Sequence, residues 1–184
     1  MRRIEVLAGY DVPAMDIEEG PGYGDAGFQF LGQLLKRALR NATPDSIGSD
    51  KGVTIYLLKA DARTSFVYAV ADGNDKPVGI LKVDKLEGLP TVDAVYVDKA
   101  FQQRGIGRAL YAGAVEAFHK LRSSPSLSMT AVLTWRSLSK FCHVMLYSKE
   151  GKPVEFTWGS DGVPAVEGKP ITSLDDDFYF LAIR

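Results

Sequence analysis

Residues 92–118 read VDAVYVDKAFQQRGIGRALYAGAVEAF, and this stretch decides the fold. It starts as an apolar, β-branched run from Val92 to Val97, which is typical of a strand. A turn with glycines at Gly105 and Gly107 follows, and apolar residues then recur at steps of three and four, as on the buried face of a helix. The free N–H groups at the start of such a helix converge and carry roughly half a positive charge. The stretch therefore predicts a phosphate-binding turn.

The residue types in this turn fit the binding of a pyrophosphate. At Gly105 and Gly107 any side chain would stand between the backbone amides and the anion, and glycine tolerates the backbone angles of a tight anion-binding turn. The helical pattern leaves Arg104 and Arg108 toward solvent or a ligand. The alternative is an ordinary strand-to-helix turn with solvated arginines, because a short glycine motif is weak evidence by itself. The predicted buried stripe of the helix consists of Ile106, Leu110, Ala114, Ala117 and Leu121.

The composition is that of one compact domain. With 184 residues, 46% of them hydrophobic and 24% charged, the chain can bury a sizeable core without a second domain. The formal net charge of -1 gives no electrostatic reason to expect nucleic acid or an anionic membrane as a partner. No segment approaches the roughly 20 apolar residues of a membrane span, so we expect a cytoplasmic protein.

The single cysteine, Cys142, cannot form an internal disulfide. Its place within the helix predicted over 137–149 favours a small packed side chain over a nucleophile. The two histidines, His119 and His143, give no recognisable spacing with it for a metal site or for nucleophilic catalysis, so we expect no metal.

Strand-like and helix-like patterns alternate along the rest of the chain. Predicted strands cover residues 2–7, 53–59, 66–71, 78–83, 92–97, 130–135, 154–158 and 178–183. Helices are predicted over 28–41 and 137–149 in addition to the motif helix, and a loop over 43–52. The strands on either side of the motif helix are joined by a parallel crossover, and the others can be antiparallel. We therefore expect a mixed, strongly twisted sheet with helices on both faces.

The motif resembles a known cofactor signature. Gln102, Gly105 and Gly107 fill the pattern Gln-x-x-Gly-x-Gly, which resembles the acetyl-CoA signature of the GCN5-related N-acetyltransferase (GNAT) family. The order of predicted elements over roughly residues 50–158 is similar to that family as well. The resemblance implies an α/β (α+β) fold, with a mixed, twisted, mostly antiparallel sheet, helices on both faces and a central splayed parallel strand pair. In the family, acetyl-CoA enters the split between these two strands.

The resemblance also implies an organisation and an activity. Residues 1–184 are then a single GNAT-like acetyltransferase domain, with an N-terminal extension over 1–50 and a C-terminal strand pair over 152–184. The implied reaction moves the acetyl group of acetyl-CoA, the co-substrate, to an amine acceptor by direct attack. The acceptor is a protein lysine, a protein N-terminus or a small amine. We expect a monomer or homodimer, with neither nucleic acid nor a membrane as a partner.

Residues that bind the co-substrate follow from the same resemblance. In the family, the strand before the motif bulges beside the cofactor, and its free amides bind the pantetheine and polarise the thioester carbonyl. The corresponding backbone positions in this chain are Val95 and Val97. The implied cofactor-binding residues are Val95, Val97, Gln102, Gln103, Arg104, Gly105, Ile106, Gly107 and Arg108.

Asp93 is the candidate general base. Direct transfer needs a base for the amine, whose solution pKa is about 10.4, and an acid for the departing thiolate, whose pKa is near 8.5. Family members with a strand carboxylate carry a glutamate that falls at Thr91 here, two residues before Asp93. Strand alternation predicts that both side chains share one face with Val95 and Val97. The alternative is a solvated or hydrogen-bonded strand aspartate.

Tyr147 is the candidate general acid. Leu146, Tyr147 and Gly151 resemble the family's Leu-Tyr-x-x-x-Gly at the end of the last helix, where the tyrosine hydroxyl lies near the CoA sulfur. The predicted helix over 137–149 would turn Tyr147 about 100 degrees from the buried Leu146 and toward the cleft. The alternative is a tyrosine that packs its ring at the edge of the core. Lys140 stands where the family often has an asparagine, and it would meet either a phosphate or solvent.

Two further alternatives remain open. Gly22, Gly24 and Gly27 form a Gly-x-Gly-x-x-Gly pattern typical of a dinucleotide-binding turn, but the acidic residues, glycine and proline over 16–21 do not fit the buried strand that such a turn follows. We interpret residues 16–27 as a loop, either a lid over the acceptor or plain surface. The second alternative concerns activity. The fold would keep its acyl-CoA affinity, catalysis would be weak because the family glutamate is replaced, and the protein would act through a protein partner.

Overall fold

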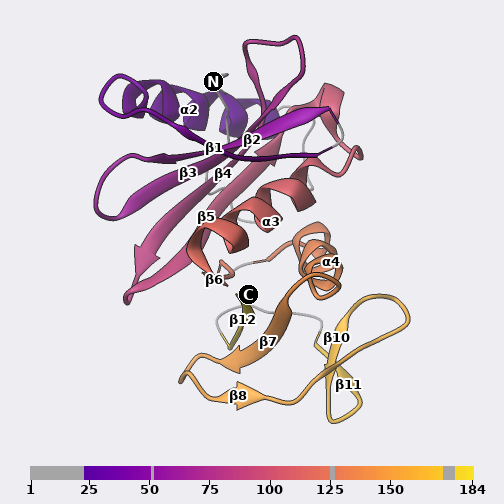
Figure 1. Cartoon of the computed structure of the whole chain (residues 1–184). Coiled ribbons are helices and arrows are strands. Elements are labelled where there is room, and N and C mark those ends of the chain that lie inside the picture. The colour runs from indigo at the N-terminus through magenta and orange to yellow at the C-terminus, as the bar shows by residue number, and fades with distance from the viewer. Residues whose placement is uncertain (1–22, 51, 125–126, 172–176) are drawn as a thin grey trace.

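The computed structural model describes residues 23–50, 52–124, 127–171 and 177–184. It contains a nine-stranded mixed sheet, with helices on both faces, and a separate three-stranded antiparallel sheet (Figure 1). The strand order is β1-β2-β3-β4-β5-β6-β12-β7-β8 in the large sheet and β11-β10-β9 in the small one. This architecture confirms the predicted mixed α/β fold, with one parallel pair in a mostly antiparallel sheet.

Five antiparallel strands form the first half of the large sheet. They are β1 (Asp45–Asp50), β2 (Val53–Lys59), β3 (Thr64–Ala71), β4 (Pro77–Leu86) and β5 (Leu89–Val97). Helix α3 (Ile106–Phe118) packs on one face of these strands, where its Leu110 joins a core cluster with Val67 and Leu81. Helix α2 (Tyr23–Ala38) packs on the opposite face, where Leu31 joins a second core cluster (Figure 1). The apolar stripe of each helix is thus buried against one side of the same strands.

The connection from β5 through the short 3-10 helix η1 (Lys99–Phe101) and α3 to β6 (Lys120–Arg122) is the predicted parallel crossover. The two strands are in register at one pair, Thr91 with Arg122. Beyond that pair the chain turns toward β12, since the N–H of Ser123 donates to the carbonyl of Phe180 at 2.9 Å. Among the described residues, no further strand pairs with β5 on this side. The parallel strands therefore splay from Thr91 onward, which leaves one edge of β5 open toward Val97.

Residues 120–149 differ from the sequence prediction. The strand predicted over 130–135 is wrong, because these residues lie in helix α4 (Met129–Leu138). The segment is rich in β-branched residues, which explains the strand prediction. Its buried residues Val132, Trp135 and Leu138 nevertheless recur at helical spacing and join the core cluster beneath α3. Ser128 is the N-cap of this helix, and its side chain accepts a hydrogen bond from the N–H of Ala131.

The helix predicted over 137–149 is also wrong, because strand β7 (His143–Ser148) occupies most of this range. Residues 143–148 form a strand and not a helix because they pair with a strand on each side. It pairs along its whole length with β12 (Phe178–Ile183) and at two positions with β8 (Pro153–Val154). Such long-range pairing overrides a local pattern that is compatible with a helix. As a result β12, near the end of the chain, lies between β6 and β7.

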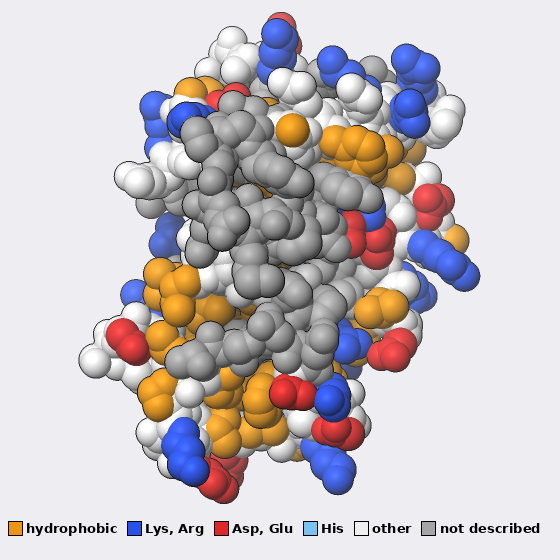
Figure 2. Space-filling model, turned by 180° about the vertical axis from the view of Figure 1, so that it is seen from behind, with side chains coloured by type: hydrophobic (Ala, Val, Ile, Leu, Met, Phe, Trp, Pro, Cys, Tyr) orange, Lys and Arg blue, Asp and Glu red, His pale blue; other side chains and the backbone are white. Residues whose placement is uncertain are grey.

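Residues 155–171 form the small sheet beside α4. Its strands are β9 (Thr157–Trp158), β10 (Pro164–Val166) and β11 (Lys169–Pro170). The single strand predicted over 154–158 is wrong, because the chain leaves the large sheet after β8 and enters the small sheet at β9. Figure 2, which shows the back of the molecule, has hydrophobic side chains gathered in its lower half, where these C-terminal strands lie.

Two predictions near the N-terminus need correction. The loop predicted over 43–52 is wrong, because β1 occupies most of it and pairs with β2. Gly24 and Gly27 lie inside α2, so the loop interpretation is wrong for residues 23–27. A Cβ at Gly27 would come within 2.7 Å of the Tyr96 ring, so close packing of α2 on β5 explains this glycine. Residues 16–22, with Gly22, and the strand predicted over 2–7 lie outside the described residues.

In the described part of the chain, no helix is both long enough and apolar enough to cross a membrane.

Candidate active site

The turn before α3 has the geometry of an anion-binding turn. Gly105 is the N-cap of α3 and has a left-handed backbone with φ of 83°, and Gln103 is also left-handed with φ of 61°. No side chain caps the helix start, and its first turn holds no acidic residue. The hydrogen bond that opens the helix runs from the N–H of Ala109 to the carbonyl of Gly105. The amides just before Ala109 have no carbonyl of the helix to bond to, so they can bind an anion.

Gly107 is not explained by the packing of the protein. Its φ does not lie in the left-handed region, and the nearest described atom to an added Cβ is the Cγ2 atom of Val97 at 4.0 Å. Neither backbone strain nor a steric clash within the described residues therefore requires glycine here. A bare backbone beside unpaired amides is what a closely bound pyrophosphate needs.

Three further motif side chains surround this turn. The side-chain amide of Gln102 donates a hydrogen bond to the carbonyl of Val97 at 3.2 Å, which ties the turn to the end of β5. The guanidinium of Arg104 lies 5.0 Å from the centre of the Phe101 ring. That of Arg108 lies 5.7 Å from the centre of the Phe141 ring. The turn thus carries two arginines, and their positive charge adds to that of the helix start in favouring an anion.

A β-bulge interrupts β5 at Asp93. In the pairing with β4, Lys82 is opposite Ala94 and Val83 is opposite Val92, so Asp93 is the extra residue of β5. The predicted bulge in this strand is therefore present, two residues before Val95. The prediction that Asp93 shares a face with Val95 and Val97 is wrong, because the bulge breaks the alternation between Asp93 and Val95.

The two core clusters show which side chains share a face. Val92 belongs to the core cluster beneath α3, and Val95 and Val97 pack against the same cluster. Ala94 belongs to the cluster beneath α2. Asp93 contacts Lys82, the residue opposite Ala94, and so lies on the α2 face, away from Val95 and Val97.

Asp93 is part of a charged cluster. The ammonium group of Lys82 donates to Oδ2 of Asp93 and to Oδ2 of Asp84, each at 2.5 Å. Thr64 donates from its hydroxyl to the other carboxylate oxygen of Asp84 at 2.9 Å. Burial is the largest single influence and would lower the pKa of Lys82, but the hydrogen bonds to Asp84 and Asp93 and their negative charges together raise that pKa above its ordinary value. Lys82 thus fixes the orientation of the Asp93 carboxylate.

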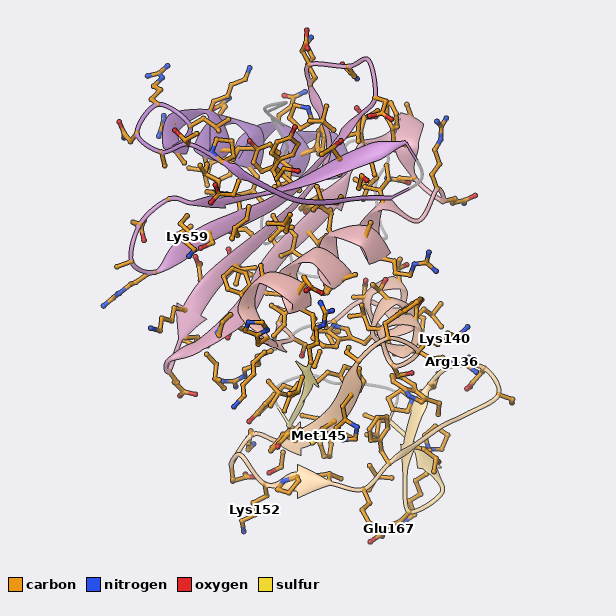
Figure 3. All side chains as sticks on the ribbon, in the orientation of Figure 1. Lys59, Arg136, Lys140, Met145, Lys152 and Glu167 are labelled. Atoms are coloured by element: carbon orange, nitrogen blue, oxygen red, sulfur yellow. The ribbon has the colours of Figure 1, made fainter. Side chains whose placement is uncertain are left out.

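Tyr147 lies on strand β7 and not at the end of a helix. Its ring stacks on that of Tyr179 of β12, with centroids 5.5 Å apart and an interplanar angle of 9°. Its hydroxyl lies 3.9 Å from the sulfur of Met145, which Figure 3 shows on β7. On the other side of Tyr179, the guanidinium of Arg122 lies 4.0 Å from the ring centre and pairs with Glu87 at 3.0 Å. The three side chains form one stack, Arg122–Tyr179–Tyr147.

Strand register relates this stack to Asp93. Thr91 pairs with Arg122, Arg122 with Leu181, and Leu181 with Met145, so these four residues lie in one row across the sheet. Tyr179 and Tyr147 pair in the next row of the same face, two residues further along, as Asp93 is two residues beyond Thr91.

Leu146 and Phe180 belong to the core cluster beneath α3, so their neighbours Tyr147 and Tyr179 face the α2 side. Asp93 and the tyrosine pair thus lie at a similar level on either side of the split.

The sequence prediction missed three of these residues. Lys82, Arg122 and Tyr179 were not candidates, although each is a polar or aromatic residue in a predicted strand or beside the motif helix. Alternation along 178–183 would have placed Tyr179 on one face with Leu181. Its partner could not be predicted, because the insertion of β12 between β6 and β7 is a long-range pairing.

Cys142 does not have the surroundings of a nucleophile. Its thiol is half-buried and donates a hydrogen bond to the carbonyl of Leu138 at 3.4 Å. Burial raises the pKa of the Cys142 thiol, which disfavours the reactive thiolate.

An open groove of about 1090 Å³ lies between β7, β8 and the small sheet. None of the expected cofactor-binding residues lines it. Met145 lines this groove and also contacts Tyr147, so the groove adjoins one candidate catalytic residue. We therefore centre the candidate site on the motif turn and the split.

Comparison with solved structures finds several acetyltransferases. The chain is similar to an IAA acetyltransferase from Bacillus cereus ATCC 14579, with 18% identity over 66% of this chain and 77% of that chain and a TM-score of 0.40. It is similar to the ribosomal-protein-S18-alanine N-acetyltransferase from Escherichia coli, with 14% identity over 67% and 70% of the two chains and a TM-score of 0.39. A protein assigned to the GNAT family from Desulfovibrio desulfuricans has 15% identity over 92% and 87% of the two chains and a TM-score of 0.43.

Sequence comparison identifies the family of the chain. No curated protein sequence matches the chain. The model of a family described as "Acetyltransferase (GNAT) family" matches residues 33–134, which include β2 to β5, the motif turn and α3. Because this match spans more than half of the 184 residues, the chain belongs to the acetyltransferase (GNAT) family.

Proposed function

We propose that this protein is an N-acetyltransferase that moves the acetyl group of acetyl-CoA directly to an amine acceptor. The observation that carries the proposal is the turn at the start of α3. Its amides, which have no hydrogen-bond partner among the described residues, and the bare backbone of Gly107 lie beside Val97, at the end of β5 where the two parallel strands have separated. A phosphate-bearing ligand bound at this turn can extend along the open edge of β5.

The donor would bind along the motif and the strand. Its pyrophosphate would accept hydrogen bonds from the amides of Ile106, Gly107 and Arg108, with the guanidinium groups of Arg104 and Arg108 beside it. The pantetheine would run along β5, where the backbone of Val95 and Val97 pairs with β4 on one side and has no strand partner among the described residues on the other. A backbone N–H on this edge would polarise the thioester carbonyl.

The transfer would take place on the α2 side of the split. The nitrogen of the amine attacks the carbonyl carbon of the thioester, so that a C–N bond forms and the C–S bond breaks. Asp93 takes the proton that the amine loses, through Oδ1, because Oδ2 is held by Lys82. Tyr147 donates its hydroxyl proton to the departing sulfur. The similar level of Asp93 and Tyr147 across the split supports these roles.

The acceptor is a small amine or an amine of a protein. The stack of Arg122, Tyr179 and Tyr147 and the cluster of Lys82, Asp84 and Asp93 lie on the face from which the acceptor would approach.

A second candidate function is acyl-CoA binding with weak catalysis. The salt bridge between Lys82 and Asp93 favours it, because Lys82 occupies one of the two carboxylate oxygens of the candidate base. Release of free thiol from acetyl-CoA, measured with a panel of small amines and lysine peptides, separates the two functions. We expect release that depends on the acceptor. Donor binding without acceptor-stimulated release would favour the binding protein.

A further inference from the structure

Phe141 has an exposed ring that the fold does not use. Its side chain is 66% exposed, whereas the other exposed large hydrophobic residues in the described part lie between 43% and 47%. It follows α4 by three residues, in the connection to β7, and it belongs to neither core cluster. A single exposed phenylalanine is not unusual. Its position beside the motif turn is the informative feature.

The ring of Phe141 lies against a residue of that turn. The guanidinium of Arg108, in the first turn of α3, is 5.7 Å from the centre of the ring. The neighbouring pair of Arg104 and Phe101 is a useful comparison, because Phe101 is half-buried and packs against the core cluster beneath α3. The ring of Phe101 is therefore occupied by packing. The ring of Phe141 has Arg108 on it and a large remaining surface open to a ligand.

The surroundings of Phe141 match the adenosine phosphate end of the donor. A planar purine stacks well on an aromatic ring or on a guanidinium plane, and the phosphates next to it need cations. Arg108 supplies one cation within contact of the ring, and Lys140, the residue before Phe141, is exposed beside α4 (Figure 3). The amides of the motif turn adjoin Arg108 in the same helix start.

We propose that Phe141 and Arg108 form the subsite for the adenine base of the acyl donor. The base stacks on the open surface of the Phe141 ring, while Arg108 supports that ring and stays beside the phosphates. This inference rests on the proposed function, because it assumes that the donor's pyrophosphate binds at the motif turn. It assigns to Phe141 a role in donor affinity and none in the chemical step.

Donors that lack parts of the nucleotide test the subsite. Calorimetry would compare acetyl-CoA, acetyl-dephospho-CoA, which keeps the adenine, and S-acetyl-4′-phosphopantetheine, which has none. The proteins would be the wild type, Phe141→Ala, Phe141→Trp and the matched control Phe30→Ala. Phe30 is an exposed phenylalanine on α2, on the opposite face of the sheet.

We expect Phe141→Ala to weaken both adenine-bearing donors by about tenfold, in line with stacking of one base on one ring. The affinity for S-acetyl-4′-phosphopantetheine should not change. Phe141→Trp should retain the affinity for acetyl-CoA, and Phe30→Ala should bind all three donors as the wild type does.

Three outcomes would overturn the inference. Phe141→Ala could bind acetyl-CoA as tightly as the wild type, or it could weaken all three donors equally, which would indicate a structural role. The loss could also vanish with acetyl-dephospho-CoA, which would assign the ring to the 3′-phosphate. A wild-type protein that binds no donor at all would overturn the proposed function, and this inference with it.

Discussion

At the scale of single residues, two tyrosines compete for the role of general acid. Tyr147 and Tyr179 stack on each other in paired positions of β7 and β12, and β12 is the strand nearer to the split. Tyr147→Phe keeps the ring and removes the hydroxyl, so we expect kcat to fall roughly ten- to a thousandfold, with Tm and donor affinity nearly unchanged. Single-turnover rates are the measurement, because slow product release would hide the effect.

Tyr179→Phe is the matched control, since the same hydroxyl is removed from the stacked partner. A smaller effect there supports Tyr147 as the acid. If Tyr179→Phe loses the activity and Tyr147→Phe keeps it, the role belongs to Tyr179.

Asp93 is tested by the dependence of the rate on pH. A carboxylate that accepts the proton of the amine makes the rate rise with pH between the acid and neutral ranges. Asp93→Asn cannot accept this proton, so we expect the rise to disappear while acetyl-CoA binding remains. Measured kcat values between about pH 4 and pH 8 would show this. An active variant with an unchanged pH profile would transfer the role to another group.

Lys82 connects the charged cluster to stability at alkaline pH. Its pKa is raised in the folded protein by Asp84 and Asp93, so the folded state holds this proton more tightly than the unfolded state does. The stabilisation is complete below the unfolded pKa of about 10.4 and is lost as pH rises through the higher folded pKa. We expect Lys82→Met to lower Tm at neutral pH, and this difference from the wild type to shrink above about pH 11.

Lys59→Met is the control for that experiment, since Lys59 is an exposed lysine at the end of β2. Its effect on Tm should be small and similar at every pH. A Lys82→Met difference that stays constant up to pH 12 would contradict the account, because the pH range of the loss follows from the raised pKa.

At the scale of elements, the fit of α2 on β5 depends on one glycine. A Cβ at Gly27 would come within 2.7 Å of the Tyr96 ring, which is itself buried. Gly27→Ala gains helix propensity, but the ring has to move, so we expect a net destabilisation of about 1–3 kcal/mol in urea unfolding. Gln33→Ala, an exposed change in the same helix, should be nearly neutral. A more stable Gly27→Ala variant would mean that the helix is packed less tightly than described.

The spacing of apolar residues correctly predicted those helices and strands in which these residues form the buried side. The strands β2 to β5 and helix α3 were predicted because alternation or helical spacing of apolar residues matches the side that each buries. Residues 130–135 were misread because β-branched residues hide the helical spacing of Val132 and Trp135. Residues 143–148 were misread because their strand depends on β12, about 30 residues later in the chain.

The part of the candidate site that is local in sequence was predictable, and the part that depends on strand pairing was not. The motif turn was predicted, because every residue of it is local in sequence. The bulge at Asp93 was expected from resemblance, but its position was not, and it reversed which side chains share a face with Asp93. Lys82, Tyr179 and Arg122 reach the site only through strand register, which a single sequence does not contain.

At the scale of the whole molecule, two halves meet at the split. The meander β1 to β5 with α2 and α3 lies on one side, and the strands β6, β12, β7 and β8 lie on the other (Figure 1). An aromatic cluster holds the second half together, since Phe180 of β12 stacks on Trp135 of α4 and on Trp158 of the small sheet. The two halves share the parallel pair at Thr91 and Arg122, and the donor would lie beyond that pair, in contact with both.

The measurement that tests the central claim most directly is the calorimetric affinity for acetyl-CoA of the wild type, Gly107→Asp and Gly48→Asp. Gly107→Asp places a carboxylate and a Cβ beside the amides of the motif turn, while Gly48→Asp makes the same change on β1 at a position with open space. We predict that the wild type and Gly48→Asp bind equally and that Gly107→Asp binds more weakly by about 2 kcal/mol or more, with its fold intact by circular dichroism. Equal affinity of a folded Gly107→Asp protein would contradict the account, because the motif turn would then lie outside the donor site.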